Sequence, residues 1–298
     1  NRTKAMAAVG GSIGLAFAAA MILGPLVASR WGLASVFWLT AALAGAGILI
    51  VLFALPEPMT RAGKEVIAFP AMFARVWRDG ELMRLNLGIY ALHFAQMATW
   101  VSVPLVLEKS LGFSRDHHWW LYLMTMGGGF IAMLPFIWYG ETRRRMKPVF
   151  VGAIALLAVA ETLLAGAAEG LVWTAIALLV FFTAFNLLEA SLPSLVSKLS
   201  PAGVRGTAMG VYSTSQFLGA FCGGVAGGYV AHQWGLLAVF WLSLAVVLVW
   251  LAVAASMRPP RYLRSLTLNI RAGEQIDSGH FLGVVPGVED LVIIADQN

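Results

Sequence analysis

Two stretches of this chain, WGLASVFWL at residues 31–39 and WGLLAVFWL at residues 234–242, are nearly the same sequence. The match extends without a gap over residues 2–39 and 205–242, at a fixed offset of 203, and 15 of these 38 positions are identical. Chance would give about three or four identities in a chain of this composition. Because paired tryptophans and the Trp-Gly turn fall in register, the sequence contains an internal repeat.

The composition is typical of a membrane protein. Hydrophobic residues occupy 59% of the 298 positions and charged residues only 12%, whereas soluble proteins keep about a quarter of their residues charged. The net charge of +5 is explained by basic cytoplasmic loops. No basic surface interleaved with aromatic residues occurs, so we expect no nucleic-acid partner. The single cysteine, Cys222, excludes an internal disulfide.

Eight apolar stretches are each long enough to cross a bilayer as a helix, which takes roughly 20 residues. They cover approximately residues 5–29, 33–55, 82–107, 117–139, 148–168, 171–197, 206–232 and 235–257. These stretches do not alternate apolar and polar residues as barrel strands do. The fold class that we expect is therefore an all-α polytopic membrane protein surrounded by lipid.

Lysine and arginine predict the orientation of these spans. With residue 1 in the cytoplasm, 17 of the 20 Lys and Arg residues fall on the cytoplasmic side and three on the other side. Because basic residues concentrate in cytoplasmic loops, both ends of the chain are expected in the cytoplasm.

The two repeat copies enter the membrane from the same side, so they are parallel and related by an axis along the membrane normal. Four apolar stretches precede the second copy, whereas none precedes the first. Subtracting the offset of 203 from Leu82 places its counterpart about 120 residues before residue 1. We therefore expect the chain to hold the last eight of twelve helices, with four N-terminal helices missing.

The first apolar stretch carries Gly11, Ala20, Gly24 and Pro25. This pattern resembles the antiporter motif in the fifth helix of the major facilitator superfamily, with alanine in place of the second glycine and other small residues in place of the last pair. The small residues are expected to allow close helix packing. Close packing alone is the alternative to a role in antiport.

Residues 186–224, NLLEASLPSLVSKLSPAGVRGTAMGVYSTSQFLGAFCGG, resemble the drug:proton antiporter-like branch of the same superfamily. The resemblance covers essentially the whole chain. It implies proton-driven efflux of a small molecule by alternating access in the bacterial inner membrane. No hydrolase triad, HExxH motif, P-loop or Cys/His metal spacing appears, so we expect no enzyme activity, cofactor or metal.

The sequence divides into four predicted parts. Residues 1–55 are the last two helices of the first transporter half, 56–81 a cytoplasmic linker, 82–257 the six-helix second half, and 258–298 a partial cytoplasmic domain. Within the linker, residues 69–77 are typical of a short amphipathic helix on the membrane surface, and a plain tether is the alternative.

The tail alternates like a strand at Leu266, Leu268 and Ile270 and has a second β-rich run at 291–294. In branch members with a small ferredoxin-like α+β domain after the last helix, such strands open that domain, and the resemblance suggests self-association through it. About 37 residues are too few to bury a proper core, so we expect a truncation here as well.

The third span carries polar and aromatic residues at intervals of three and four. They are Asn86, Tyr90, His93, Met97 and Trp100, with Gln96 beside His93. Helix packing explains a stripe of Leu and Ala, but an unpaired imidazole is costly in lipid and titrates near neutral pH. The stripe therefore predicts one wall of a water-filled cavity for an amphipathic or cationic substrate. Tyr212 and Gln216, one turn apart in the seventh span, are expected to face the same cavity.

Two glutamates lie inside predicted spans, where burying a charge costs at least about 2.5 kcal/mol. Glu189 lies about 18 residues, or roughly 27 Å, into its helix and so near the cytoplasmic end, with Asn186 one turn away. Glu189 is a candidate for proton coupling, as is His93, or it is a structural partner for a cytoplasmic arginine such as Arg205. Glu161 is a third coupling candidate, or it snorkels to the outer surface.

The function that we expect is proton-coupled efflux, with two halves rocking about a midplane cavity. The rival function is a non-transporting membrane sensor that signals through its cytoplasmic C-terminal domain. Movement of a substrate against its gradient distinguishes the two.

Overall fold

The computed structural model describes residues 26–54, 69–200 and 204–257, together with residues 16, 19, 20, 23 and 24. Every regular element in these residues is helical, which confirms the all-α class for this part of the chain. The elements are α2 (Leu33–Phe53), α3 (Phe69–Arg78), α4 (Gly80–Leu105), the π-helix η1 (Val106–Ser110), α5 (Arg115–Thr142), α6 (Met146–Ala165), the 3-10 turn η2 (Ala167–Glu169), α7 (Leu171–Leu199), α8 (Arg205–Trp234) and α9 (Ala238–Ala255). Most of the first predicted span and the whole predicted ferredoxin-like tail lie outside the described residues.

Six of the described helical segments are long and apolar enough to cross a membrane. They are α2, α4 together with η1, α5, α6, α7 and α9. The helix α8 lies where a span was predicted at 206–232, but it does not belong to these six because glycine and polar residues lower its hydropathy. The composition of α8 suits a helix that contacts other helices and polar groups as well as lipid.

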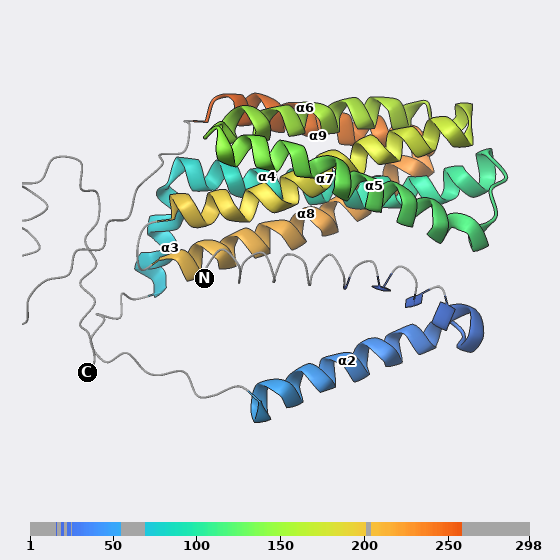
Figure 1. Ribbon diagram of the computed structural model, residues 1–298, viewed down its shortest axis with the longest axis horizontal. Helices are drawn as coiled ribbons and strands as arrows, with labels where there is room; N and C mark the ends of the chain where they lie inside the picture. The colour runs from blue at the N-terminus through green and yellow to red at the C-terminus, as the bar shows by residue number, and fades with distance from the viewer. Residues whose placement is uncertain are drawn as a thin grey trace, which may run out of the picture. The chain divides into compact units, whose positions relative to one another are not determined.

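The helices α4 to α9 run side by side as a bundle (Figure 1). The most extensive contact is between α4 and α8, and α4 also packs against α7 and α9. The helices α5 and α6 both pack against α7, and α6 also packs against α9. This arrangement makes α4 and α7 central, so that polar residues on their inner faces meet other helices rather than lipid.

Glycines on α8 explain how closely α8 approaches α4. A Cβ atom on Gly219 would overlap the carbonyl oxygen of Tyr90, and one on Gly223 would overlap that of Phe94. Four residues further on, Gly227 lies against Ala98. These three glycines, which we call the glycine seam, let the two backbones touch directly.

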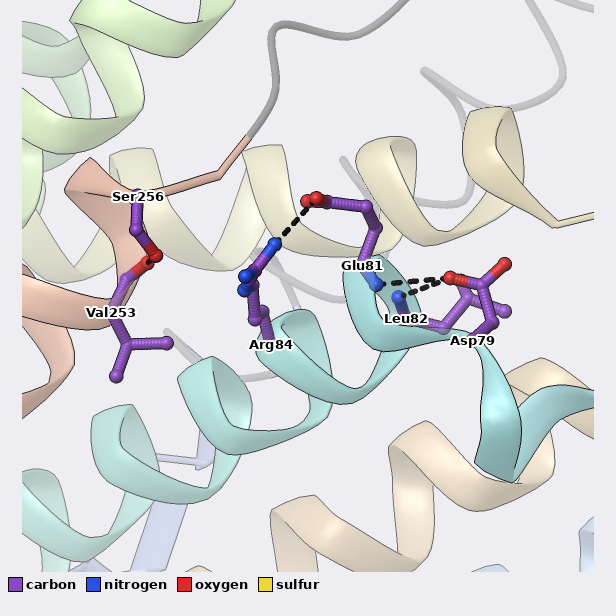
Figure 2. Close-up of polar contacts among 6 residues, drawn as sticks. All are labelled: Asp79, Glu81, Leu82, Arg84, Val253 and Ser256. Atoms are coloured by element: carbon purple, nitrogen blue, oxygen red, sulfur yellow. Dashed lines mark hydrogen bonds and ion pairs between the residues drawn. The ribbon is translucent and has the colours of Figure 1, made fainter.

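The start of α4 is fixed by a side-chain cap (Figure 2). The Asp79 carboxylate accepts hydrogen bonds from the backbone N–H groups of Glu81 at 3.0 Å and Leu82 at 3.1 Å, which satisfies two donors that have no helical partner. Within the first turn, Glu81 forms an ion pair with Arg84.

The linker contains the predicted short helix, α3. Its residue Val76 is buried, whereas Phe73 and Trp77 are exposed and stack on each other with ring centroids 5.8 Å apart. Because α3 contacts both α4 and α8, it is held against the bundle rather than being a plain tether.

Candidate functional site

Three polar side chains from three helices meet inside the bundle. They are His93 of α4, Glu189 of α7 and Gln216 of α8, which we call the polar triad. The Gln216 side-chain nitrogen lies 2.8 Å from His93 Nε2 and 3.5 Å from Glu189 Oε1. His93 Nε2 lies 3.8 Å from Glu189 Oε2. The prediction that Gln216 shares a site with His93 therefore agrees with the geometry.

The glycine seam positions two members of the triad. Gln216 precedes Gly219 by three residues and His93 follows Tyr90 by three residues, so the contact of Gly219 with Tyr90 brings the two polar side chains together. His93 is 13 residues from Gly80, the first residue of α4, and 12 from Leu105, the last. His93 thus lies at the middle of α4, whereas Glu189 is 10 residues from the end of α7 at Leu199 and Gln216 is 11 residues from the start of α8 at Arg205. The position of Glu189 toward the cytoplasmic end stays a prediction.

The imidazole of His93 is buried and held on three sides. Its Nδ1 lies 3.3 Å from the carbonyl oxygen of Ile89, and its ring packs edge-on against Phe185 at 5.9 Å. Because a carbonyl only accepts, the proton belongs on Nδ1, and Nε2 is left to accept from the amide of Gln216. The ring is neutral in this arrangement, and its second nitrogen faces the carboxyl of Glu189.

Glu189 is the member of the triad that is open to its surroundings. Its side chain is 37% exposed, against 11% for that of His93, yet its Oε2 atom is covered and has no hydrogen-bond partner. The alternative that Glu189 pairs with Arg205 is wrong, because no ion pair between the two occurs in the described residues. Arg205 starts α8 and lies 11 residues from Gln216, or about 16 Å along the helix.

Unpaired polar atoms lie within two turns of the triad on each of its helices. They are Asn86 Oδ1 on α4, Asn186 Nδ2 on α7 and the hydroxyl of Tyr212 on α8. Buried polar atoms without partners are uncommon in folded proteins and call for a water molecule or ligand. The sequence had identified all three residues.

The remaining members of the predicted stripe do not join the triad. Trp100 packs edge-on against Tyr122 of α5 at 4.7 Å and also approaches Phe182 of α7. Tyr90 packs against Phe94. Gln96 is half-buried.

Glu161 of α6 lies apart from the triad and is fully buried. The expectation that it snorkels to the outer surface is wrong, because its Oε1 atom instead accepts a hydrogen bond from the Thr99 hydroxyl of α4 at 3.1 Å. Thr99 was not among the residues predicted from the sequence. Thr99 and His93 are six residues apart, which places them on different faces of α4, and only the helix arrangement shows that Thr99 meets an acid.

The helix-packing motif is only partly within the described residues. Gly11 and Pro25 lie outside them, and a Cβ atom on Gly24 would meet nothing within 4 Å. Its repeat counterpart, Gly227, does pack closely against Ala98. The close packing inferred for the first copy thus stays a prediction, whereas the second copy has it.

No group of three or more His, Cys, Asp or Glu residues in the described part of the chain could hold a metal ion. What the site offers is a carboxyl, an imidazole and an amide in a hydrogen-bonded row, which are groups that bind and exchange protons and cations.

Six membrane-length helices, together with a row of polar side chains on α4, α7 and α8, are typical of a multi-pass membrane protein of the transporter type. The chain belongs to the Major Facilitator Superfamily, whose model matches residues 1–224 and 85–283.

Proteins similar to this chain include named transporters. The chain is 44% identical over 273 residues to the inner membrane transport protein YajR of Escherichia coli (strain K12), covering 91% of this chain and 60% of that protein. It is 33% identical over 226 residues to an uncharacterized transporter of Buchnera aphidicola, covering 75% of this chain and 57% of the relative. It is 28% identical over 152 residues to the multidrug resistance protein MdtG of Klebsiella pneumoniae, covering 49% of this chain and 36% of that protein. The chain thus spans about 60% of the length of the first of these relatives.

Proposed function

We propose that the protein containing this chain is a proton-coupled exporter, and that the polar triad is where protons and substrate act on each other. The observation that carries the proposal is the row of His93, Gln216 and Glu189, drawn from three helices inside the bundle. Ionisable groups at that depth are rare and commonly mark ion pathways and proton relays.

In this proposal the two ionisable members of the triad have different roles. Glu189 is the more exposed and takes up or releases the coupling proton. His93, held by the Ile89 carbonyl and the Gln216 amide, receives the proton when the two halves rock. Gln216 contacts both groups and keeps them in line while either one changes charge.

The substrate class follows from the groups around the triad. A carboxyl favours a cation, and three aromatic side chains lie on the three helices within two turns of the triad: Tyr90, which is half-buried, and Phe185 and Tyr212, which are buried. Aromatic faces attract organic cations by about 0.5–2 kcal/mol each. An amphipathic or cationic molecule therefore fits, and export agrees with the name of the multidrug resistance relative.

The cellular arrangement belongs to the same proposal. The name of the E. coli relative supports the bacterial inner membrane, and the lysine and arginine asymmetry supports a cytoplasmic position for both ends of the chain. Self-association through residues 258–298 stays a prediction. The comparisons offer nothing in favour of the sensor alternative.

The test uses inside-out membrane vesicles that contain the full gene product and ethidium as an aromatic cationic probe. An imposed proton gradient is expected to drive ethidium into the vesicles, and a proton ionophore is expected to stop it. Glu189→Gln should abolish the movement. Movement that survives both the ionophore and Glu189→Gln would contradict proton coupling at the triad.

A further inference from the structure

The carboxyl of Glu161 is the one fully buried acid among the described residues, and the proposed transport step makes no use of it. Its exposed fraction is zero. One oxygen accepts from the Thr99 hydroxyl at 3.1 Å, and the other, Oε2, has no hydrogen-bond partner. A carboxylate at such a place needs a cation or several donors, and one hydroxyl does not supply them.

No counter-charge is available from the neighbouring elements. None of the three ion pairs in the described part of the chain includes Glu161, and α9 carries no titratable side chain. The elements packed against α6 are α5, α7, α9 and η2. The titratable side chains on them that are not exposed are His118 and Tyr122 on α5 and Glu189 on α7, and each has other neighbours. On α4, which supplies Thr99, the His93 ring contacts Ile89 and Gln216.

The geometry points to Glu161 as a second proton-binding site, separate from the triad, whose bound proton keeps α4 and α6 in contact through Thr99. With the proton bound, the group is neutral and can stay in the dry interior. Without the proton, the charge must reach water, and the contact between the two helices has to open. Proton binding and closure of this contact are therefore linked.

The partner of Glu161 lies next to an irregular part of α4. Thr99 precedes Pro104 by five residues, and proline removes one donor from the helical hydrogen bonds. The chain then continues as the π-helix η1, where the N–H of Leu111 donates to the carbonyl of Val106 at 3.1 Å. Such π-turns are weaker than α-helix and common at functional sites. The Thr99 contact thus anchors α4 just before a segment that bends easily.

The hydrogen-bonded contact between Glu161 and Thr99, which we call the latch, depends on pH with a definite sign. The closed contact is complete when Glu161 holds its proton, and it is lost as the pH rises through the titration of that group. Glutamine has nearly the same shape, is always neutral and still accepts from Thr99. Glu161→Gln is therefore expected to keep the contact closed at every pH, whereas Thr99→Val removes its hydrogen bond without a change in charge.

The first measurement is infrared difference spectroscopy on the full gene product in lipid at neutral pH. The difference between wild type and Glu161→Gln is expected to contain the carbonyl band of a protonated carboxyl, and the same band should be present in a Glu189→Gln background. Carboxylate bands in that difference would overturn the inference, because they would show Glu161 to be ionised.

The second measurement is hydrogen exchange of the backbone amides of residues 106–111, corrected at each pH for the intrinsic rate. Exchange in wild type is expected to rise with pH, in Glu161→Gln to stay flat, and in Thr99→Val to be fast throughout. A rise in Glu161→Gln equal to that in wild type would overturn the latch. Neither measurement uses transport, so failure here is distinguishable from failure of the proposed function.

Discussion

Glu161 and Glu189 are two acids in consecutive membrane-length helices, and they differ both in exposure and in hydrogen-bond partners. Glu189 is partly exposed and has an imidazole and an amide within 4 Å. Glu161 is sealed, with one hydroxyl as its partner. A proton on Glu189 can be exchanged for another cation, whereas a proton on Glu161 leaves only when helices separate. The position of an acid within an apolar helix therefore does not define its role. The side chains on the facing helices define it.

The largest expected effect separates the two acids by transport. In ethidium uptake by inside-out vesicles, Glu189→Gln is expected to lower the rate at least about 100-fold, the scale on which removal of a proton-transferring group acts. Glu161→Gln, which keeps a neutral hydrogen-bonding side chain, is expected to transport at close to the wild-type rate. Equal losses of ethidium uptake in Glu189→Gln and Glu161→Gln would contradict the different roles assigned to the two acids.

When stability is measured instead of transport, the substitution of Glu161 is expected to have the larger effect. Glu161→Ala leaves the Thr99 hydroxyl unpaired and a space in a closed interior, so we expect a loss of about 2–4 kcal/mol in the free energy of unfolding. Glu189→Ala is expected to cost about 1 kcal/mol, because its side chain is partly exposed and leaves no closed cavity behind. Unfolding in detergent, followed by tryptophan fluorescence, measures both. The reverse order would contradict the account of their burial.

The glycine seam tests whether the triad depends on the approach of α8 to α4. Gly223→Ala places a methyl group against the carbonyl of Phe94 and is expected to destabilise the protein by about 1–3 kcal/mol while separating Gln216 from His93. The matched control is Gly224→Ala, whose Cβ atom meets nothing within 4 Å. The two variants are compared by unfolding and by ethidium uptake. Equal behaviour would show that the seam does not hold the triad.

The smallest effects come from the neutral partner of each acid. Gln216→Leu and Thr99→Val each remove one hydrogen bond and are expected to cost about 1 kcal/mol of stability. Only Gln216→Leu is expected to change how ethidium uptake depends on pH, since it removes the group between Glu189 and His93. If the pH dependence of ethidium uptake changed in Thr99→Val but not in Gln216→Leu, Glu161 rather than Glu189 would be the coupling acid.

Much of the fold follows from the sequence, because apolar stretches of about 20 residues have few alternatives to a membrane-spanning helix. The spans predicted at 82–107, 171–197 and 235–257 agree closely with the helices found, and α3 lies where residues 69–77 predicted it. The spacing of Asn86 and His93 on one face of α4, and of Tyr212 and Gln216 on α8, also identified four of the six residues of the candidate site in advance.

The partners of the two acids could not be predicted, since pairing depends on how helices distant in the sequence lie against each other. Arg205 was the cation suggested as a partner for Glu189, but the seam brings Gln216 and His93 there instead. Glu161 has the length to snorkel, yet the packing of α6 against α7 and α9 turns it inward to Thr99. Periodicity indicates which residues share a face, and it carries no information about the opposite helix.

The central claim is that Glu189 exchanges its proton for a cationic substrate, and proton release on binding tests it most directly. Ethidium is added to the purified gene product in weakly buffered detergent solution, and the released protons are counted with a pH indicator. The account predicts release from wild type and from Glu161→Gln, and none from Glu189→Gln. Release from Glu189→Gln equal to that from wild type would contradict it.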